Sequence, residues 1–197
     1  MNLVKRLSSP WAHTALFTLV LLVDQLTKHW ARLQFSLPNG EPNYSDSLPV
    51  ISDWLHFRLV YNYGAAFGMK PQNVVPFLHP IVFFALFSVA AIGFLGIYYR
   101  RLGPGEPAAR LGILMILAGA FGNLIDRISM HRVTDFIDAG IPGLSPRWPV
   151  FNIADSAVCI GIALLLIPPF FTRSASTRKT APHAEHTSSS ESTPHDA

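Results

Sequence analysis

Two short motifs in this sequence each place an aspartate beside apolar residues. Residues 133–136 read VTDF and carry Asp135, and residues 151–155 read FNIAD and carry Asp155. A loop rich in proline and glycine separates them, and after Asp155 no acidic or basic residue occurs until Arg173. An aspartate at the mouth of an apolar helix is costly to place in a membrane and usually serves a function. Because the loop brings the second aspartate back towards the first, the pattern predicts a paired-carboxylate site.

Two neighbouring carboxylates supply a defined chemistry. They do not both ionise easily, so their titrations split and the pair holds one proton. The ionised partner takes a proton from water, and the protonated partner donates one to the carbonyl group under attack. This chemistry requires no metal ion, no cofactor and no nucleophilic side chain. An alternative stays open, because loop aspartates are often helix caps or solvated charges, and Asp155 is near an N-cap position.

Further polar residues lie near the ends of apolar segments. Asp24 and Lys28 are four residues apart, in the favourable acid-first order of a helical ion pair. The pair either stabilises a helix end or braces the carboxylate site, and pairing lowers the cost of each charge at a bilayer boundary. Asn123, Asp126 and Arg127 share a helix face, from which Arg127 can hold carboxylates in a planar fork. This group either joins helices by hydrogen bonds or belongs to the site.

The elements that must position these residues are predicted to be membrane helices. Half of the 197 residues are hydrophobic, 14% are charged, and the mean hydropathy is +0.32. A helix that crosses the hydrocarbon needs about 20 mostly apolar residues. The long stretches without acidic or basic residues, extended to their polar ends, predict four spans at about 11–34, 74–99, 109–128 and 152–171. We therefore expect an all-α membrane protein with four transmembrane helices.

Basic residues gather at the span ends that the positive-inside rule assigns to the cytoplasm. The net charge is +3 and the pI is near 9.2, but the cations do not cluster as they do in a nucleic-acid binder, so no such partner is expected. With four spans, one side receives Lys5, Arg6, Arg100, Arg101, Arg110, Arg173, Arg178 and Lys179. Both termini are therefore expected to be cytoplasmic, and the acidic motifs lie on the opposite side.

The two outer loops, residues 35–73 and 129–151, are expected to hold the non-helical structure. Within residues 54–62, apolar and polar residues alternate, which predicts a short strand with one apolar face. Residues 36–49 are rich in Ser, Pro, Asn and Gly and predict an exposed loop.

Three other features complete the expected organisation. Residues 172–197 are rich in Ser, Thr and His without apolar periodicity, which predicts a disordered cytoplasmic tail. Trp11 and Trp30 are expected near the two membrane interfaces. Cys159 is the only cysteine, so no intramolecular disulfide forms, and we expect it to be a small packing residue.

Five segments, in order, resemble the successive motifs of the bacterial lipoprotein signal peptidase family, also called signal peptidase II. They are residues 24–28 (DQLTK), 62–68 (NYGAAFG), 122–127 (GNLIDR), 133–136 (VTDF) and 151–155 (FNIAD). The resemblance covers about residues 11–171 and includes the order of the four expected spans. One motif of this length is a weak signal, whereas five in order are specific.

The resemblance implies an intramembrane aspartic endopeptidase that removes the signal peptide from prolipoproteins. The substrate carries a diacylglyceryl group on the cysteine that becomes the new N-terminus, and the cut falls before that cysteine. By motif match, Asp135 and Asp155 are the catalytic pair, with no metal and no cofactor. The supporting and substrate-binding residues are then Asp24, Lys28, Asn62, Asn123, Arg127 and Asn152.

The family also implies how the chain is organised. Residues 1–171 form a four-span peptidase domain of the bacterial inner membrane, with the active site near the periplasmic face. The strand at residues 54–62 belongs to a small periplasmic sheet that cradles the substrate. The expected partners are the diacylglyceryl-prolipoprotein substrate and membrane lipids, and the chain is expected to be a monomer.

Two other classes of function are compatible with polar groups in a membrane protein. Intramembrane acidic and basic residues often mark the ion pathway of a proton-coupled transporter or a channel subunit. Such a pathway needs polar groups near the midplane, whereas Asp24, Asn123, Arg127, Asp135 and Asp155 all map to outer span ends. A non-catalytic scaffold would not need both acidic motifs. These observations favour the peptidase.

Overall fold

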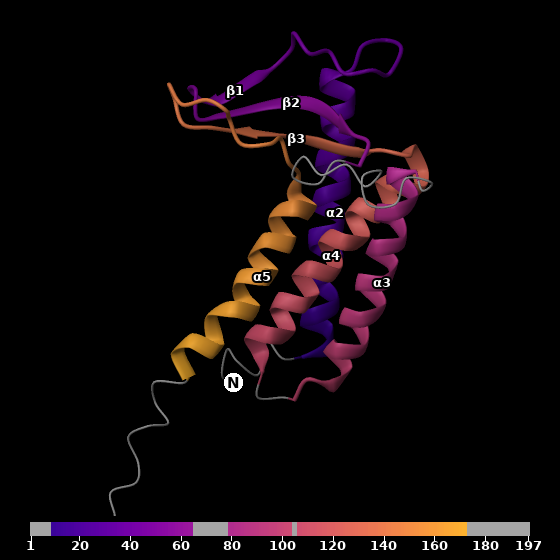
Figure 1. Cartoon of the computed structure of the whole chain (residues 1–197), viewed down its shortest axis with the longest axis vertical. Coiled ribbons are helices and arrows are strands. Elements are labelled where there is room, and N and C mark those ends of the chain that lie inside the picture. The colour runs from indigo at the N-terminus through magenta and orange to yellow at the C-terminus, as the bar shows by residue number, and fades with distance from the viewer. Residues whose placement is uncertain (1–8, 65–78, 104–105, 173–197) are drawn as a thin grey trace, which may run out of the picture.

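The computed structural model describes residues 9–64, 79–103 and 106–172. These residues form four helices and a three-stranded sheet, which lies across one end of the helices (Figure 1). The helices are α2 (Pro10–Phe35), α3 (Pro80–Arg101), α4 (Pro107–Met130) and α5 (Ile153–Thr172). The tail from residue 173, residues 65–68 of the second motif and residues 74–78 of the second expected span lie outside the described residues.

Local sequence explains where the helices begin and end. The side chain of Ser9 caps α2 by accepting a hydrogen bond from the Ala12 amide at 3.1 Å. Helices α2, α3 and α4 each have a proline in the first turn, where the missing amide hydrogen costs nothing. Helix α4 ends at His131, whose left-handed backbone (φ 57°) turns the chain out of the helix. This turn leads directly into the strand that carries Asp135.

Small residues allow α4 and α5 to approach closely. Helix α4 packs against α2, α3 and α5, so it is the centre of the helical bundle. A Cβ atom added to Gly112 would lie 2.7 Å from the carbonyl oxygen of Gly161, and one added to Gly119 would overlap the carbonyl oxygen of Ala154. Membrane helices often use small residues in this way, because van der Waals packing replaces the hydrophobic effect as the force that joins them.

The sheet is antiparallel, in the order β1-β2-β3. Its strands are β1 (Leu48–Ile51), β2 (Leu55–Asn62) and β3 (Val133–Ala139). The strand predicted at residues 54–62 is confirmed as β2. The exposed loop expected at 36–49 extends to Ser47, and only Leu48 and Pro49 belong to β1. The expectation for the VTDF motif is wrong, because the motif lies in a strand rather than a loop. Val133, Thr134, Phe136 and Ile137 are β-branched or aromatic residues, which favour a strand there.

A hydrophobic cluster joins the sheet to the end of α2. Its buried members are Ala31, Phe35, Leu59, Tyr61 and Phe136. Trp30, which was expected at a membrane interface, packs edge-to-face on Phe35, Phe57 and Phe136 with ring centroids 5.6 to 6.3 Å apart. This packing fixes the sheet on α2, and the sheet in turn fixes β3.

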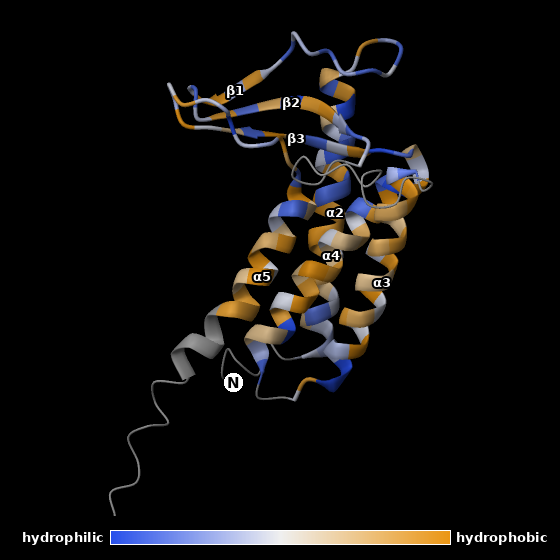
Figure 2. Cartoon of the chain, in the orientation of Figure 1, coloured by the Kyte–Doolittle hydropathy of each residue, from blue (hydrophilic) through white to orange (hydrophobic). Residues whose placement is uncertain are grey.

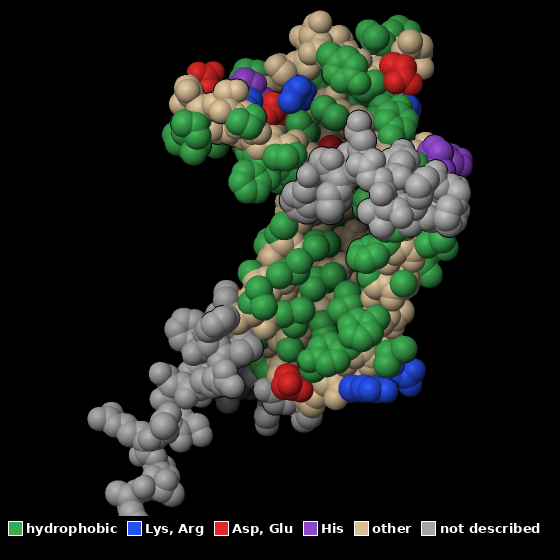
Figure 3. All heavy atoms as spheres, viewed as in Figure 1, with side chains coloured by type: hydrophobic (Ala, Val, Ile, Leu, Met, Phe, Trp, Pro, Cys, Tyr) green, Lys and Arg blue, Asp and Glu red, His purple; other side chains and the backbone are tan. Residues whose placement is uncertain are grey.

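The exterior of the helices is apolar. Hydrophobic residues run along α3, α4 and α5, while the sheet mixes hydrophobic and hydrophilic residues and charged residues lie near the sheet and at the opposite ends of the helices (Figures 2 and 3). Of the described helices, α3 and α4 are long and apolar enough to cross a membrane. Helix α2 carries Asp24, Lys28 and Arg32, and the described apolar part of α5, Ile153–Leu166, is shorter than a full span. The architecture is thus mostly helical with a small antiparallel sheet.

Candidate active site

The two aspartates of the predicted pair come from a strand and from the first turn of a helix that line one cavity. Asp135 is buried in β3, and Asp155 lies in the first turn of α5. The chain returns to β3 just before α5 begins, since Phe151 exchanges backbone hydrogen bonds with Ile137 at 2.8 and 3.0 Å. The loop between the motifs therefore brings both carboxylates to the same cavity.

Asn152 connects the two carboxylates. Its side-chain nitrogen donates to Asp135 at 2.7 Å and also to the oxygens of Asn123 and Thr134. Its side-chain oxygen accepts from the Asp155 amide at 2.9 Å, while the Asp155 carboxylate accepts from the Asn152 amide at 3.2 Å. This reciprocal pattern is a capping box, in which Asn152 is the cap and Asp155 is the acidic partner three residues later. Asp155 thus has a capping role and still presents a carboxylate oxygen to its neighbours.

Two further amides each hold one carboxylate. The side-chain nitrogen of Asn123 donates to Asp155 at 2.8 Å, and that of Asn62 donates to Asp135 at 3.3 Å. Asn123 comes from α4 and Asn62 from the end of β2. The pair is therefore oriented by residues from three separate segments, including Asn152.

A buried charge network lies directly behind these amides. Lys28 is fully buried and contacts Asp24 at 2.9 Å, Asp126 at 3.5 Å and the side-chain oxygen of Asn123 at 2.8 Å. Asp24 also accepts from the Ala154 amide at 2.9 Å. A Cβ on Gly122 would overlap the Asp24 carboxylate, so only glycine leaves room for it. The Asp24–Lys28 pair is therefore tied to the site and is not an exposed ion pair at a helix end.

Asp126 has a role that the sequence analysis missed. Its carboxylate accepts a hydrogen bond from the Thr134 amide at 2.9 Å, one residue before Asp135. The sequence places Asp126 on the same helix face as Asn123. It does not reveal β3, so it does not reveal the Thr134 amide as the partner of Asp126. This hydrogen bond fixes the position of β3 relative to α4.

Arg127 does not form the predicted carboxylate fork. Among the described residues no carboxylate lies within ion-pair distance of its guanidinium group. The group instead donates to the Asn123 carbonyl oxygen at 3.3 Å and lies 5.6 Å from the centre of the Phe84 ring. Its Nε atom is buried without a hydrogen-bond partner. Arg127 lines the same cavity as both aspartates, so its charge is available near them without neutralising either directly.

Burial alters the acidity of Asp135. The pKa of this side chain is raised from 3.8 to about 7, first because burial disfavours the charged form and second because Asp155 is a neighbouring negative charge. Hydrogen bonds from Asn62 and Asn152 and the charge of Lys28 lower the pKa in part. A carboxyl group with this pKa gains and loses its proton near neutral pH, as general acid–base chemistry requires.

The cavity has a volume of about 570 Å³, with a polar end and a long apolar wall. Asn62, Asn123, Arg127, Asp135 and Asp155 form the polar end. The apolar wall comes from α3, from β3, from the loop before α5 and from α5 itself, and includes Phe84, Val133, Trp148, Pro149, Val150, Phe151, Val158 and Ile160.

Cys159 is not the buried packing residue that was expected, because it is exposed and lines this cavity. Its position on the exposed side of α5 follows from packing, which the sequence around it does not reveal. In the described parts of the chain, no group of three or more His, Cys, Asp or Glu side chains is arranged to hold a metal ion.

The fold is similar to that of solved bacterial membrane enzymes. One such structure, determined by the in meso method at 2.3 Å, is 27% identical, with a TM-score of 0.71 over 88% of this chain and 96% of its own. A second, determined at 1.9 Å, is 28% identical with a TM-score of 0.66 over 80% and 92%. The fold and the apolar helices thus define a bacterial membrane enzyme.

Sequence comparisons identify which kind. The family model described as signal peptidase (SPase) II matches residues 16–171. The lipoprotein signal peptidase of Moorella thermoacetica is 41% identical over 147 residues, which are 75% of this chain and 85% of that protein. The lipoprotein signal peptidase of Coxiella burnetii is 37% identical over 172 residues, which are 87% and 97%. The chain belongs to the signal peptidase II family of aspartic peptidases.

Proposed function

We propose that this protein removes the signal peptide from prolipoproteins by means of Asp135 and Asp155. The observation that carries the proposal is the hydrogen-bonded frame in which Asn152 and Asn123 hold the two carboxylates at the polar end of one cavity. The relatives described above are lipoprotein signal peptidases, which favours this function over a transporter or a scaffold.

The proposed reaction is hydrolysis with one proton shared by the pair. The ionised carboxylate takes a proton from water as the water oxygen attacks the scissile carbonyl carbon, and the protonated carboxyl donates its proton to the carbonyl oxygen. The tetrahedral intermediate then collapses and the carbon–nitrogen bond breaks. The leaving amine takes the proton that the first carboxylate had accepted from water, and a hydroxyl group of the intermediate returns a proton to the second carboxylate as the new carboxyl group forms. The pKa of Asp135 near 7 supports this role, because the side chain changes protonation state at the working pH.

The supporting residues have separate roles in this proposal. Asn62, Asn123 and Asn152 orient the carboxylates through the hydrogen bonds described above. Asp24 and Lys28 hold α2, α4 and α5 together behind the site. Arg127 has a buried Nε without a hydrogen-bond partner and borders the cavity, which suits it to bind a substrate oxygen.

The proposed substrate carries a diacylglyceryl group on the cysteine that follows the scissile bond. An apolar wall next to the carboxylates provides a surface for acyl chains and for the hydrophobic signal peptide. Each buried methylene contributes about 0.8 kcal/mol, so even a few would favour the lipidated precursor over the unmodified one. Cleavage would then fall before the lipidated cysteine.

The proposed location is the bacterial inner membrane, with α2, α3, α4 and α5 as four spans. Arg100 and Arg101 lie in the last turn of α3, at the end away from the sheet, which suits the cytoplasmic side. Both termini would then be cytoplasmic, and the carboxylates would lie near the periplasmic face. Residues 1–171 would be the peptidase domain, residues 172–197 a cytoplasmic tail, and the chain a monomer in contact with membrane lipids.

The orientation can be tested with engineered cysteines in a Cys159→Ser background. Ser45→Cys places a thiol in the segment before the sheet, and Glu106→Cys places one between α3 and α4. A membrane-impermeant maleimide applied to intact spheroplasts should label the first variant and reach the second only after lysis. The reverse pattern would contradict the proposed topology.

The function itself is tested with one precursor in two forms. Purified protein is given a prolipoprotein with and without the diacylglyceryl group, and the product N-terminus is determined by mass spectrometry. We expect a cut directly before the modified cysteine and at least tenfold slower cleavage of the unmodified form. Absence of cleavage of the lipidated precursor would refute the function, and equal rates would refute the role of the acyl chains.

A further inference from the structure

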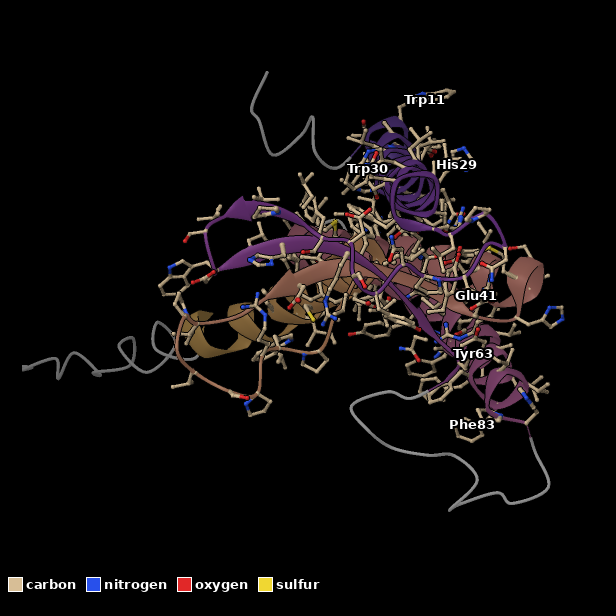
Figure 4. The ribbon with its side chains drawn as sticks, turned by 90° about the horizontal axis from the view of Figure 1, so that it is seen from above. Trp11, His29, Trp30, Glu41, Tyr63 and Phe83 are labelled. Carbon is tan, nitrogen blue, oxygen red and sulfur yellow. The ribbon has the colours of Figure 1, made fainter. Side chains whose placement is uncertain are left out.

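Arg132 connects three segments just outside the cavity. It lies between the end of α4 and the start of β3, and its Nη1 donates to Glu41 at 3.0 Å and to the Tyr63 hydroxyl at 3.1 Å. Glu41 belongs to the segment that follows α2, and Tyr63 follows β2; the two side chains lie at the same end of the sheet (Figure 4). Arg132 thus holds together chain segments that are distant in the sequence.

Stacking gives this contact a fixed geometry. The guanidinium carbon of Arg132 lies 3.6 Å from the centre of the Tyr61 ring, and Tyr61 is itself buried in the core beneath the sheet. The Tyr61 hydroxyl donates to the Gly40 carbonyl oxygen at 3.2 Å. Glu41 is held in turn, because its carbonyl oxygen accepts from the Leu37 amide at 2.8 Å. The planar guanidinium is therefore fixed both by a ring face and by two hydrogen bonds.

The residue between the two tyrosines is Asn62, which contacts the proposed catalytic pair. Successive side chains of a strand point to opposite faces, so Tyr61 and Asn62, the last two residues of β2, lie on opposite faces, and Tyr63 follows the strand. The strand register places Asn62 opposite Val133 and Val60 opposite Asp135, so Asn62 and Asp135 are diagonal neighbours on the same face. Holding both tyrosines therefore sets the direction in which Asn62 points.

We propose that Arg132 is a positioning residue, which acts through Asn62 to hold the hydrogen bond from Asn62 to Asp135. The proposal rests on the function proposed above. Without the stacked guanidinium, Tyr61 stays in the core, but the two tyrosines that flank Asn62 lose their common contact, so the contact of 3.3 Å between Asn62 and Asp135 is held less firmly. Lysine does not replace arginine here, because an ammonium group keeps the charge and can donate to two acceptors but lacks the plane that stacks on the Tyr61 ring.

The test is a double-mutant cycle on cleavage of the lipidated precursor. Arg132→Lys, Asn62→Ala and the double variant are compared with the wild type in kcat and KM. We expect Arg132→Lys to lower kcat about tenfold with little change in KM, because small misplacements of a catalytic contact have effects of this order. In the Asn62→Ala background the same substitution should have no further effect, since the residue through which Arg132 acts is gone.

The control is Arg58→Lys, which changes an arginine of β2, the strand that carries Asn62; Arg58 contacts Asp138 and not the pair. It should leave kcat unchanged. A wild-type kcat in Arg132→Lys, or an equal loss of kcat with and without Asn62, would overturn the proposal. Where Arg132→Lys fails to fold, Glu41→Gln weakens the same bridge and should show the same dependence on Asn62.

Failure of this inference is distinguishable from failure of the proposed function. When the wild type cuts the precursor and the cycle shows no coupling, only the role of Arg132 is wrong. When the wild type does not cut it, the function itself is wrong, and the inference that rests on it falls too.

Discussion

Two charged clusters in this protein pair aspartate with basic residues in different surroundings. Behind the catalytic pair, Lys28 lies between Asp24 and Asp126, and all three side chains are buried at 0 to 1% exposure. At the far margin of the sheet, the Asp138 carboxylate accepts from Arg58 at 2.7 Å and from Arg147 at 2.8 Å. Those two arginines are 37% and 32% exposed.

The comparison teaches which charges the fold depends on. In the inner cluster each charge has lost its water, so it is tolerable only while its partners remain. In the outer cluster the arginines keep much of their hydration, and such pairs contribute little on their own. We therefore expect the inner cluster to be sensitive to any single change and the outer cluster to tolerate one.

The largest effect is expected for Lys28→Ala. It leaves the Asp24 and Asp126 carboxylates buried without their shared cation, which costs about 3–5 kcal/mol and prevents stable folding in detergent. Thermal unfolding followed by tryptophan fluorescence measures the loss. The matched change in the outer cluster is Arg147→Ala, and a similar loss of stability in both variants would contradict the difference between the clusters.

A smaller effect is expected when the inner cluster is crowded rather than broken. In Gly122→Ala the new methyl group overlaps the Asp24 carboxylate, so α2 and α4 separate at a cost of about 1–3 kcal/mol. Gly93→Ala is the control, because a methyl group there meets nothing within 4 Å and alanine is the better helix former by about 0.5–1 kcal/mol. Melting midpoints of the two variants should move in opposite directions. A shift of both in the same direction would show that the glycine at 122 is not needed for this contact.

An effect of intermediate size is expected from Asp135, and it depends on pH. Its pKa is about 7 when folded and near 3.8 when unfolded, so between these values the folded protein binds more protons. Stability from this group is therefore complete below about pH 4 and is lost as the pH rises through 7. Asp135→Asn removes this loss.

The measurement for this prediction is the melting midpoint from pH 4.5 to 8 for the wild type and Asp135→Asn. The variant should gain stability relative to the wild type as the pH rises. A difference that stays constant across this range would show that Asp135 is not protonated in the fold.

The smallest effect is expected for Arg58→Gln in the outer cluster. Arg147 still holds Asp138, and a half-exposed pair contributes about 1 kcal/mol or less. The melting midpoint should fall by a few degrees at most, and cleavage should be unchanged. A loss of stability as large as that of Lys28→Ala would place this cluster among the essential contacts of the fold.

The helices and the acidic positions were accessible from the sequence because each has a local signal. Long apolar segments predict helices whatever their partners are, and Asp135 and Asp155 were conspicuous beside apolar residues. Spacing within one helix identifies Asp24 as a partner of Lys28, and the family resemblance places the pair near the site, but neither reveals the contacts of Lys28 with Asn123 and Asp126 on another helix.

The remaining features depend on tertiary packing. β3 was not predicted, because the VTDF motif was interpreted as part of a loop on account of its aspartate, although Val133 and Ile137 favour a strand. The prediction that Arg127 holds carboxylates in a fork was wrong, because the charge of a side chain does not determine where it points. The guanidinium group lies over the Phe84 ring instead. Exposure of Cys159 follows from which face of α5 meets α4, which a uniformly apolar helix does not indicate.

The central claim is that Asp135 and Asp155 act as one catalytic pair, and it is tested most directly by replacing each with asparagine. Cleavage of the diacylglyceryl-modified prolipoprotein is measured for wild type, Asp135→Asn and Asp155→Asn in nanodiscs, with folding checked by thermal melt. The account predicts that both folded variants lose at least about a thousandfold in rate while the wild type cuts before the modified cysteine. A folded variant that keeps near-normal activity would contradict it, because its aspartate would then be structural.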